Sequence, residues 1–253
     1  MRYWFSLRLM SVAAAYWYST LAICGVFGGA MVCLPVTGRM PWRWLLATAL
    51  YLTVDVDVSA LAPRIHGLSW NWTGKAASVL LGLVAMRGFR LSRAEVGLQL
   101  PRRTTWPWLG FGFAIILFLT LVGSHGLYRQ HIDFETVLFQ ATMPGLSEEF
   151  AYRGVAYALL MRGFGEERPR SSAFAAVLIT SCCFGLGHIE PSGVPLPPDF
   201  FWMMVRFRAF EFGSHFLFGA LFALMRWRSG SVLAPVLAHG LSNVAGTLAA
   251  GRV

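Results

Sequence analysis

The chain has 253 residues, of which 56% are hydrophobic and 13% are charged, and its formal net charge is +9. Soluble domains are closer to half apolar and a quarter charged, so this composition excludes a disordered chain, a secreted disulfide scaffold and an ordinary cytosolic enzyme. A bilayer span needs about 20 apolar residues, and the chain has room for several of them. The composition therefore predicts a polytopic integral membrane protein.

Eight apolar segments follow one another along the chain, and each is predicted to be a helix, because an open sheet leaves backbone groups unsatisfied in lipid. They are Ser11–Pro35, Trp42–Ala62, Leu68–Met86, Trp106–Ser124, Phe134–Met161, Ser172–His188, Phe200–Arg226 and Ser231–Ala250. The third segment is the weakest, since Lys75 lies inside it. We therefore expect an all-α transmembrane bundle of about eight spans, forming a single integral membrane domain over residues 1–253.

The positive charge resides in 20 Arg and one Lys. The Arg residues lie mainly at the ends of apolar segments, where topology signals lie, so we expect no nucleic-acid partner. If the Arg87–Arg103 loop is cytoplasmic, 12 basic residues fall on that side and six on the other, with the Ile189–Asp199 loop outside. The strong preference for Arg is typical of a GC-rich bacterial genome, so the expected location is the bacterial cell membrane.

Ionisable residues inside spans are informative, because each costs about 2.5–3.5 kcal/mol at mid-helix on insertion scales. The fifth segment carries Glu148, Glu149 and Arg153. Glu149 and Arg153 are four residues apart and share a helix face on which they can pair. Glu148 is turned about 100° away from that face. The pattern therefore offers one carboxylate neutralised by Arg and one available for chemistry.

Two further segments carry polar motifs with the same spacing. Phe184 and His188 lie in FGLGH at the end of the sixth segment, where two glycines leave room for close approach. His239 and Asn243 lie in HGLSN in the eighth. Together the three segments supply a base, a second acid–base group and neutral donors for an oxyanion. The alternative reading, in which each motif only makes hydrogen bonds between helices, stays open.

Other polar residues give weaker signals. Asp55 and Asp57 point about 200° apart on a helix and lack the GxGD signature of aspartyl intramembrane proteases, so we expect an interface or ion-pair role. Glu211 and His215 are four residues apart and are expected to form a structural ion pair. The sequence contains no HExxH motif, P-loop or dinucleotide-binding glycine motif.

The ordered trio EEFAYR, FGLGH and HGLSN resembles the CPBP family of intramembrane proteases, also called Abi, named for CAAX prenyl endopeptidases and bacteriocin-processing enzymes. The resemblance covers residues 134–250, which would form the catalytic core. It implies hydrolysis of peptide bonds in or near the bilayer.

The resemblance also implies roles for the motif residues. Glu148 and His188 would activate the attacking water, with Glu148 as the general base. His239 and Asn243 would hold the tetrahedral oxyanion. The residues implied to support the site are Glu149, Arg153 and Phe184.

Metal dependence stays open on the resemblance, since the family has been described both as metal-dependent and as a glutamate-type protease. We expect no cofactor, because Asn is a poor zinc ligand and no second carboxylate is suitably placed. A zinc enzyme would use Glu148, His188 and His239.

The topology puts the motif residues in the non-cytoplasmic half of the membrane. This position suits trimming of membrane-anchored proteins at C-terminal sorting tails better than CAAX-like processing of prenylated tails. The expected partners are the lipid bilayer and a protein or peptide substrate with a membrane-embedded or lipidated segment. Two alternatives are a non-catalytic immunity or scaffold protein on the same fold and an ion-coupled transporter, which would show an inverted repeat that we do not find.

Overall fold

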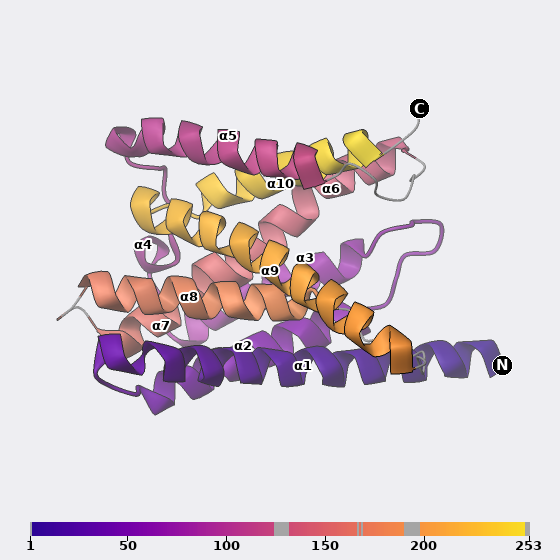
Figure 1. The fold of residues 1–253 in the computed structure, drawn as a ribbon, viewed down its shortest axis with the longest axis horizontal. Helices are drawn as coiled ribbons and strands as arrows, with labels where there is room; N and C mark the ends of the chain where they lie inside the picture. Colours follow the sequence, from indigo (N-terminus) through magenta and orange to yellow (C-terminus); the bar gives the residue numbers. More distant parts are fainter. Residues whose placement is uncertain (1, 124–131, 166, 168, 190–197, 251–253) are drawn as a thin grey trace. The chain divides into compact units, whose positions relative to one another are not determined.

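The computed structural model describes residues 2–123, 132–165, 167, 169–189 and 198–250, and these residues form helices and no strand (Figure 1). The helices are α1 (Arg2–Thr37), α2 (Trp42–Leu61), α3 (Trp72–Gly88), α4 (Arg93–Val96), η1 (Arg103–Thr105), α5 (Trp106–Gly123), α6 (Phe134–Glu149), η2 (Phe150–Ala156), α7 (Tyr157–Phe164), α8 (Pro169–Gly187), α9 (Pro198–Ser229) and α10 (Leu233–Ala250). A helix keeps its backbone hydrogen bonds within one segment, as the bilayer interior requires. The predicted all-α class is confirmed.

The first of two compact units comprises Met1–Leu61 and Leu159–Ala220. Within it, α1 packs along both α2 and α8. The contact with α8 is close: a Cβ built on Gly25 would lie 2.9 Å from the Cys183 Sγ atom. Small residues allow helices to approach in this way inside a membrane, where packing rather than the hydrophobic effect drives association.

The second unit comprises Ala62–Ala158 and Leu221–Val253. In it α10 packs against α6 and α5, while α3 packs against α6 and η2. The hydroxyl oxygens of Thr120 and Ser242 lie 2.7 Å apart and form a buried hydrogen bond between α5 and α10. This unit carries the first and third sequence motifs, on α6–η2 and α10.

Two glycines determine how closely α6 and α10 approach. A Cβ on Gly145 of α6 would lie 2.7 Å from the backbone oxygen of Val236. A Cβ on Gly240 of α10 would overlap the backbone oxygen of Ala141. Neither position has room for a larger side chain, so the sequence of both helices is fitted to this contact.

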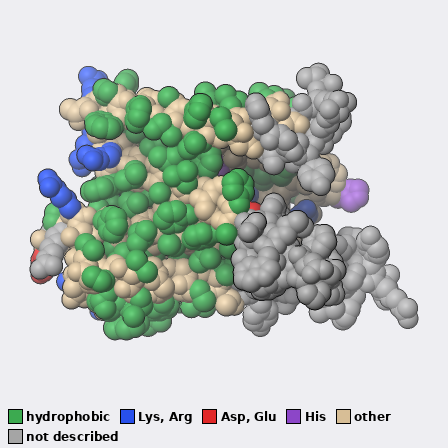
Figure 2. All heavy atoms as spheres, in the orientation of Figure 1, with side chains coloured by type: hydrophobic (Ala, Val, Ile, Leu, Met, Phe, Trp, Pro, Cys, Tyr) green, Lys and Arg blue, Asp and Glu red, His purple; other side chains and the backbone are tan. Residues whose placement is uncertain are grey.

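Within the described part of the chain, five helices are long and apolar enough to cross a membrane: Ser19–Thr37, Trp42–Leu61, Arg103–Gly123, Pro169–Gly187 and Leu233–Ala250. They coincide with the first, second, fourth, sixth and eighth predicted segments. Hydrophobic side chains are spread over the described part of the face shown in Figure 2, as contact with lipid requires. Because α3 and α6 have only 17 and 16 residues, the number of eight spans stays a prediction.

Two other expectations also stay predictions. One is the single membrane domain over residues 1–253, of which the segment 134–250 contributes to both units. The other is the membrane orientation. Most of the Ile189–Asp199 loop on which the orientation partly depends, residues 190–197, lies outside the described residues.

Gly240→Ala is expected to destabilise the protein, because its added methyl group would overlap the Ala141 carbonyl of α6. Overpacking of this kind costs about 1–3 kcal/mol. The measurement is the midpoint of thermal unfolding of the purified protein in detergent. Gly110→Ala on α5 is the control, since nothing lies within 4 Å of its added Cβ. Equal midpoints for the two variants would contradict the tight contact between α6 and α10.

Candidate active site

The EEFAYRG motif lies where α6 gives way to a wider π-helical turn, η2. All seven residues of η2 are buried. Such turns are rare within α-helices and are frequently found at functional sites. The Arg226 Nε atom donates a hydrogen bond to the backbone oxygen of Arg153 at 3.1 Å, so a side chain from α9 fixes the irregular turn.

Glu149 is the centre of a buried charged cluster. Its Oε1 atom accepts from Arg153 Nη1 at 3.2 Å and lies 2.8 Å from His239 Nδ1. The side chains of Glu149 and Arg153 are both 0% exposed. The four-residue spacing predicts the Glu149–Arg153 pair, and the structure adds His239 from α10. We call these three residues the Glu149 cluster.

Aromatic rings enclose the Glu149 cluster. The Phe222 ring is stacked on the His239 imidazole with centroids 5.0 Å apart. The Arg153 guanidinium lies over the same Phe222 ring and over Tyr152, at 5.6 Å from each centroid. Removing one partner of a buried ion pair leaves an uncompensated charge and costs about 3–5 kcal/mol. The cluster therefore holds the first and third motifs in a fixed relation.

Glu148 has different surroundings from its neighbour. Its Oε1 atom lies 2.6 Å from the Nζ atom of Lys75 on α3, and both side chains are about one-fifth exposed. Because the two glutamates point in different directions, as the helical geometry predicts, each meets a different cation. By its sequence position alone, Lys75 only weakens the third segment as a predicted span. The signal in the sequence that could have indicated a functional role for Lys75 is that the only Lys of the chain lies inside an apolar run.

The second motif lies in the first unit. His188 follows the end of α8; its Nδ1 atom lies 2.8 Å from the Phe184 backbone oxygen, and the two rings are 4.4 Å apart. The His188 ring is also stacked on His215 of α9, with centroids 4.3 Å apart and an interplanar angle of 14°. A Cβ on Gly185 would lie 3.0 Å from the Phe212 oxygen, so the motif glycine does allow close approach of another helix.

His215 and Asn243 are two further residues that the sequence singles out. The His215 Nδ1 atom lies 2.8 Å from the backbone oxygen of Glu211, so the four-residue spacing produces a contact with the main chain, and the expected ion pair between the two side chains stays a prediction. Asn243 lies one turn beyond His239 on α10 and is partly exposed. Its contribution to an oxyanion site stays a prediction.

The two aspartates of α2 lie in the first unit. Asp57 accepts a hydrogen bond from the Ser19 hydroxyl of α1 at 2.9 Å, and Asp55 is buried. The Asp57 contact joins two helices, as an interface role requires.

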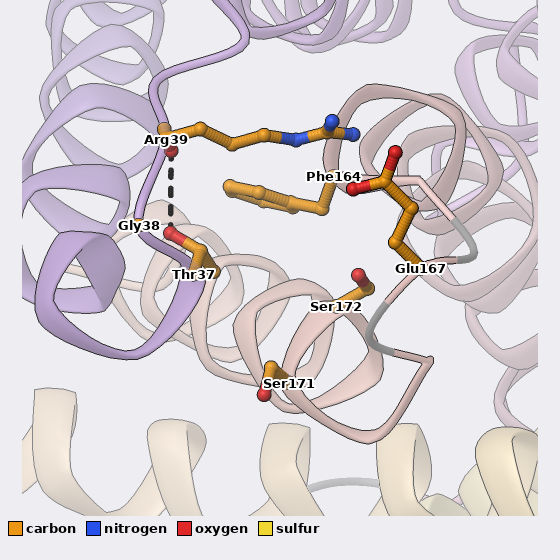
Figure 3. Close-up of a pocket in the computed structure, with 7 residues that line it drawn as sticks. All are labelled: Thr37, Gly38, Arg39, Phe164, Glu167, Ser171 and Ser172. Atoms are coloured by element: carbon orange, nitrogen blue, oxygen red, sulfur yellow. Dashed lines mark hydrogen bonds between the residues drawn. The ribbon is translucent and has the colours of Figure 1, made fainter.

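The pocket in Figure 3 contains none of the motif residues. It belongs to the first unit, beside the turn after α1 and the turn between α7 and α8. The residues that line it are Thr37, Gly38, Arg39, Phe164, Glu167, Ser171 and Ser172.

The donor set of the zinc alternative is engaged in other contacts. Among the residues that the structure describes, no three His, Cys, Asp or Glu side chains are arranged to hold a metal ion. The His239 Nδ1 atom faces Glu149, and the Lys75 ammonium lies against Glu148. A cation in contact with Glu148 opposes a second cation at the same carboxylate. The absence of a cofactor stays a prediction.

A set of apolar helices that buries a Glu–Arg–His cluster defines an integral membrane protein with a polar centre, and in this class such residues mark functional sites. Residues 129–245 match a family model described as Type II CAAX prenyl endopeptidase Rce1-like. The match confirms the resemblance to the CPBP family that the three motifs carry, and all three lie within the matched range. It supports an intramembrane CAAX-type endopeptidase in general. No curated protein and no solved structure matches the chain.

Glu149→Gln and Glu148→Gln are expected to have unequal effects on stability. The first leaves the Arg153 charge buried without its carboxylate and is expected to cost about 3–5 kcal/mol. The second alters a pair that is about one-fifth exposed, so the Lys75 charge it leaves is not fully buried, and its cost is expected to be smaller than that of the first. Unfolding midpoints in detergent measure both. A Glu149→Gln variant as stable as Glu148→Gln would contradict the structural role of the Glu149 cluster.

Proposed function

We propose that this protein is an intramembrane endopeptidase that hydrolyses peptide bonds of membrane-associated substrates, near C-terminal sorting tails or in CAAX-like tails. The observation that carries the proposal is the presence of two adjacent glutamates in the family-matched segment, one enclosed by its own counter-ions and the other partly exposed. An enclosed ion pair maintains geometry, whereas the Glu148 side chain is partly exposed and thus lies closer to the surface of the unit. The substrates and the residue roles are part of the proposal.

Glu148 is the general base of the proposed reaction, and His188 shares in activating the water. The Glu148 carboxylate takes one proton from the water while the water oxygen bonds to the substrate carbonyl carbon. The carbonyl oxygen becomes an oxyanion. The C–N bond then breaks, and the proton held by Glu148 passes to the leaving amine. Positioned general acid–base groups of this kind contribute about 10²–10⁴-fold in rate.

His239 and Asn243 hold the oxyanion in this mechanism. Because Glu149 accepts from Nδ1 of His239, Nε2 of the neutral ring carries no hydrogen. Donation to an oxyanion therefore requires the imidazolium form of His239, with Glu149 as its counter-ion. The Asn243 amide is a neutral donor from the same helix. Donors arranged in advance around a developing charge are among the largest contributions to catalysis.

The proposed enzyme is of the glutamate type and works without a metal. The contact between Lys75 and Glu148 supports this, since the ammonium already supplies the positive charge beside the carboxylate. We place the protein in the bacterial cell membrane, with its site open to the non-cytoplasmic half. The Arg distribution along the sequence supports this orientation.

Cleavage of internally quenched peptides by the protein in lipid vesicles tests the proposal. One peptide ends in a prenylated Cys-aliphatic-aliphatic-X sequence, and the other ends in a hydrophobic sorting tail. We expect cleavage of at least one peptide, lowered about 10²–10⁴-fold by Glu148→Gln and by His188→Ala. The control is Glu167→Gln, which alters an exposed carboxylate outside the three motifs.

The same variants in cells identify natural substrates. Proteins that accumulate unprocessed with Glu148→Gln and His188→Ala, and not with Glu167→Gln, are the expected targets. Wild-type rates in folded Glu148→Gln would contradict the proposed base. A folded wild-type protein that cleaves neither peptide and alters no protein in cells would favour the non-catalytic immunity or scaffold alternative.

A further inference from the structure

Lys75 is the only Lys among 21 basic residues, and it lies near the start of an apolar helix. A Lys near a helix end usually extends its ammonium toward the membrane surface. Here the ammonium instead lies 2.6 Å from Glu148 Oε1, and only 21% of the Lys75 side chain is exposed. A residue with this cost in lipid and this partner needs a reason beyond packing.

The start of α3 is anchored to α6 by a separate set of contacts. The Glu135 carboxylate accepts hydrogen bonds from the backbone N–H groups of Ser69 and Trp70, each at 3.1 Å, and from Trp72 Nε1 at 3.0 Å. The Trp70 Nε1 atom donates to the Thr136 hydroxyl at 3.0 Å. Since α6 also carries Glu148, the first turn of α3 is held on the helix that bears the proposed base.

The N-terminus of α3 is also well defined. The Asn71 side chain accepts from the Gly74 N–H at 3.1 Å and caps the helix. Lys75 follows in the same turn. The backbone around Lys75 is therefore held both by the helix cap and by the Glu135 hydrogen bonds. This distinguishes the Lys75–Glu148 pair from an exposed ion pair between two mobile side chains.

The two glutamates need separate cations. Arg153 is committed to Glu149 inside the buried cluster, and Arg226 donates to the main chain of Arg153. Lys75 supplies the positive charge beside Glu148, so adjacent carboxylates that would otherwise repel each other are each compensated.

The choice of Lys over Arg has a chemical consequence. An ammonium is a compact charge that contacts one carboxylate oxygen, as Lys75 contacts Oε1. A guanidinium tends to bind a carboxylate through both oxygens in a fork. Such a fork would hold the Glu148 carboxylate in a different orientation from the one that a contact at a single oxygen gives. The other 20 basic residues of the chain are all Arg. The single Lys is found where the difference between an ammonium and a guanidinium would matter.

We propose that Lys75 is a positioning residue, which orients the Glu148 carboxylate for its role as the base through contact with its Oε1 atom. This inference rests on the proposed function of Glu148. Lys75 does not touch the substrate in this scheme, so its loss affects turnover rather than substrate binding.

The test compares Lys75→Met and Lys75→Arg with wild-type protein in lipid vesicles, using whichever of the two quenched peptides the wild type cleaves. For Lys75→Met we expect kcat to fall at least about 10-fold, with KM within about twofold, because an unoriented base loses part of its contribution. Lys75→Arg is expected to fold and to keep the positive charge, yet to have a kcat below that of the wild type. Arg87→Met, which alters an exposed residue in the last turn of α3, is the control.

A purely structural ion pair would be preserved by Arg, so Lys75→Arg with wild-type kcat would overturn the proposal. Wild-type kcat in folded Lys75→Met, or a raised KM with unchanged kcat, would also overturn it. Lys75→Arg decides the matter if Lys75→Met fails to fold. These outcomes bear on Lys75 only if Glu148→Gln lowers the rate of cleavage. If folded Glu148→Gln cleaves the peptide as fast as the wild type, the proposed function is wrong instead.

Discussion

The ion pair between Glu149 and Arg153, completed by His239, is the contact on which the rest of the second unit depends. It lies where α6 changes into a π-helical turn and where α10 crosses α6 closely enough to need glycine. In the interior of a membrane such charges are tolerated only when they are paired. Replacing the carboxylate would leave a buried guanidinium, so the motif residues cannot be exchanged one at a time without loss of the packing around them.

This contact also explains how adjacent glutamates can do different things. Glu149 points into the cluster and is fully enclosed, while Glu148, turned by one residue, points toward α3. Burial with an Arg makes the first carboxylate a fixed structural charge. The second carboxylate belongs to a partly exposed side chain beside an ammonium, and we propose that it exchanges a proton during the reaction. Separate surroundings are a general way in which two like residues take different roles in one site.

Much of this arrangement could be predicted from local sequence pattern. Apolar segments identify the helices, and four-residue spacing identifies Glu149 with Arg153 and Phe184 with His188. The order of the three motifs carries the resemblance to the family, because it combines signals that are weak one by one. The predictions work because each depends on residues within one or two helical turns, where geometry is nearly fixed.

The contacts that sequence could not provide join distant parts of the chain. Lys75 and Glu148 are 73 residues apart, and the stacking of His215 on His188 depends on how α8 meets α9. The π-helical turn is also absent from the pattern, since it arises where packing and the Arg226 contact outweigh regular α geometry. The Lys75 charge makes the third segment a weak span by hydropathy. The same charge is informative, because it has a partner, Glu148, on another helix.

A structure of the protein bound to a phosphinic peptide, which mimics the tetrahedral intermediate of peptide hydrolysis, would test the division of roles between the two glutamates. Crystals grown in a lipid mesophase would place the phosphinate directly. We expect one phosphinate oxygen beside the Glu148 carboxylate, with Glu149 still bound to Arg153 and His239. A phosphinate held against Glu149, or Glu148 directed away from it, would contradict this assignment.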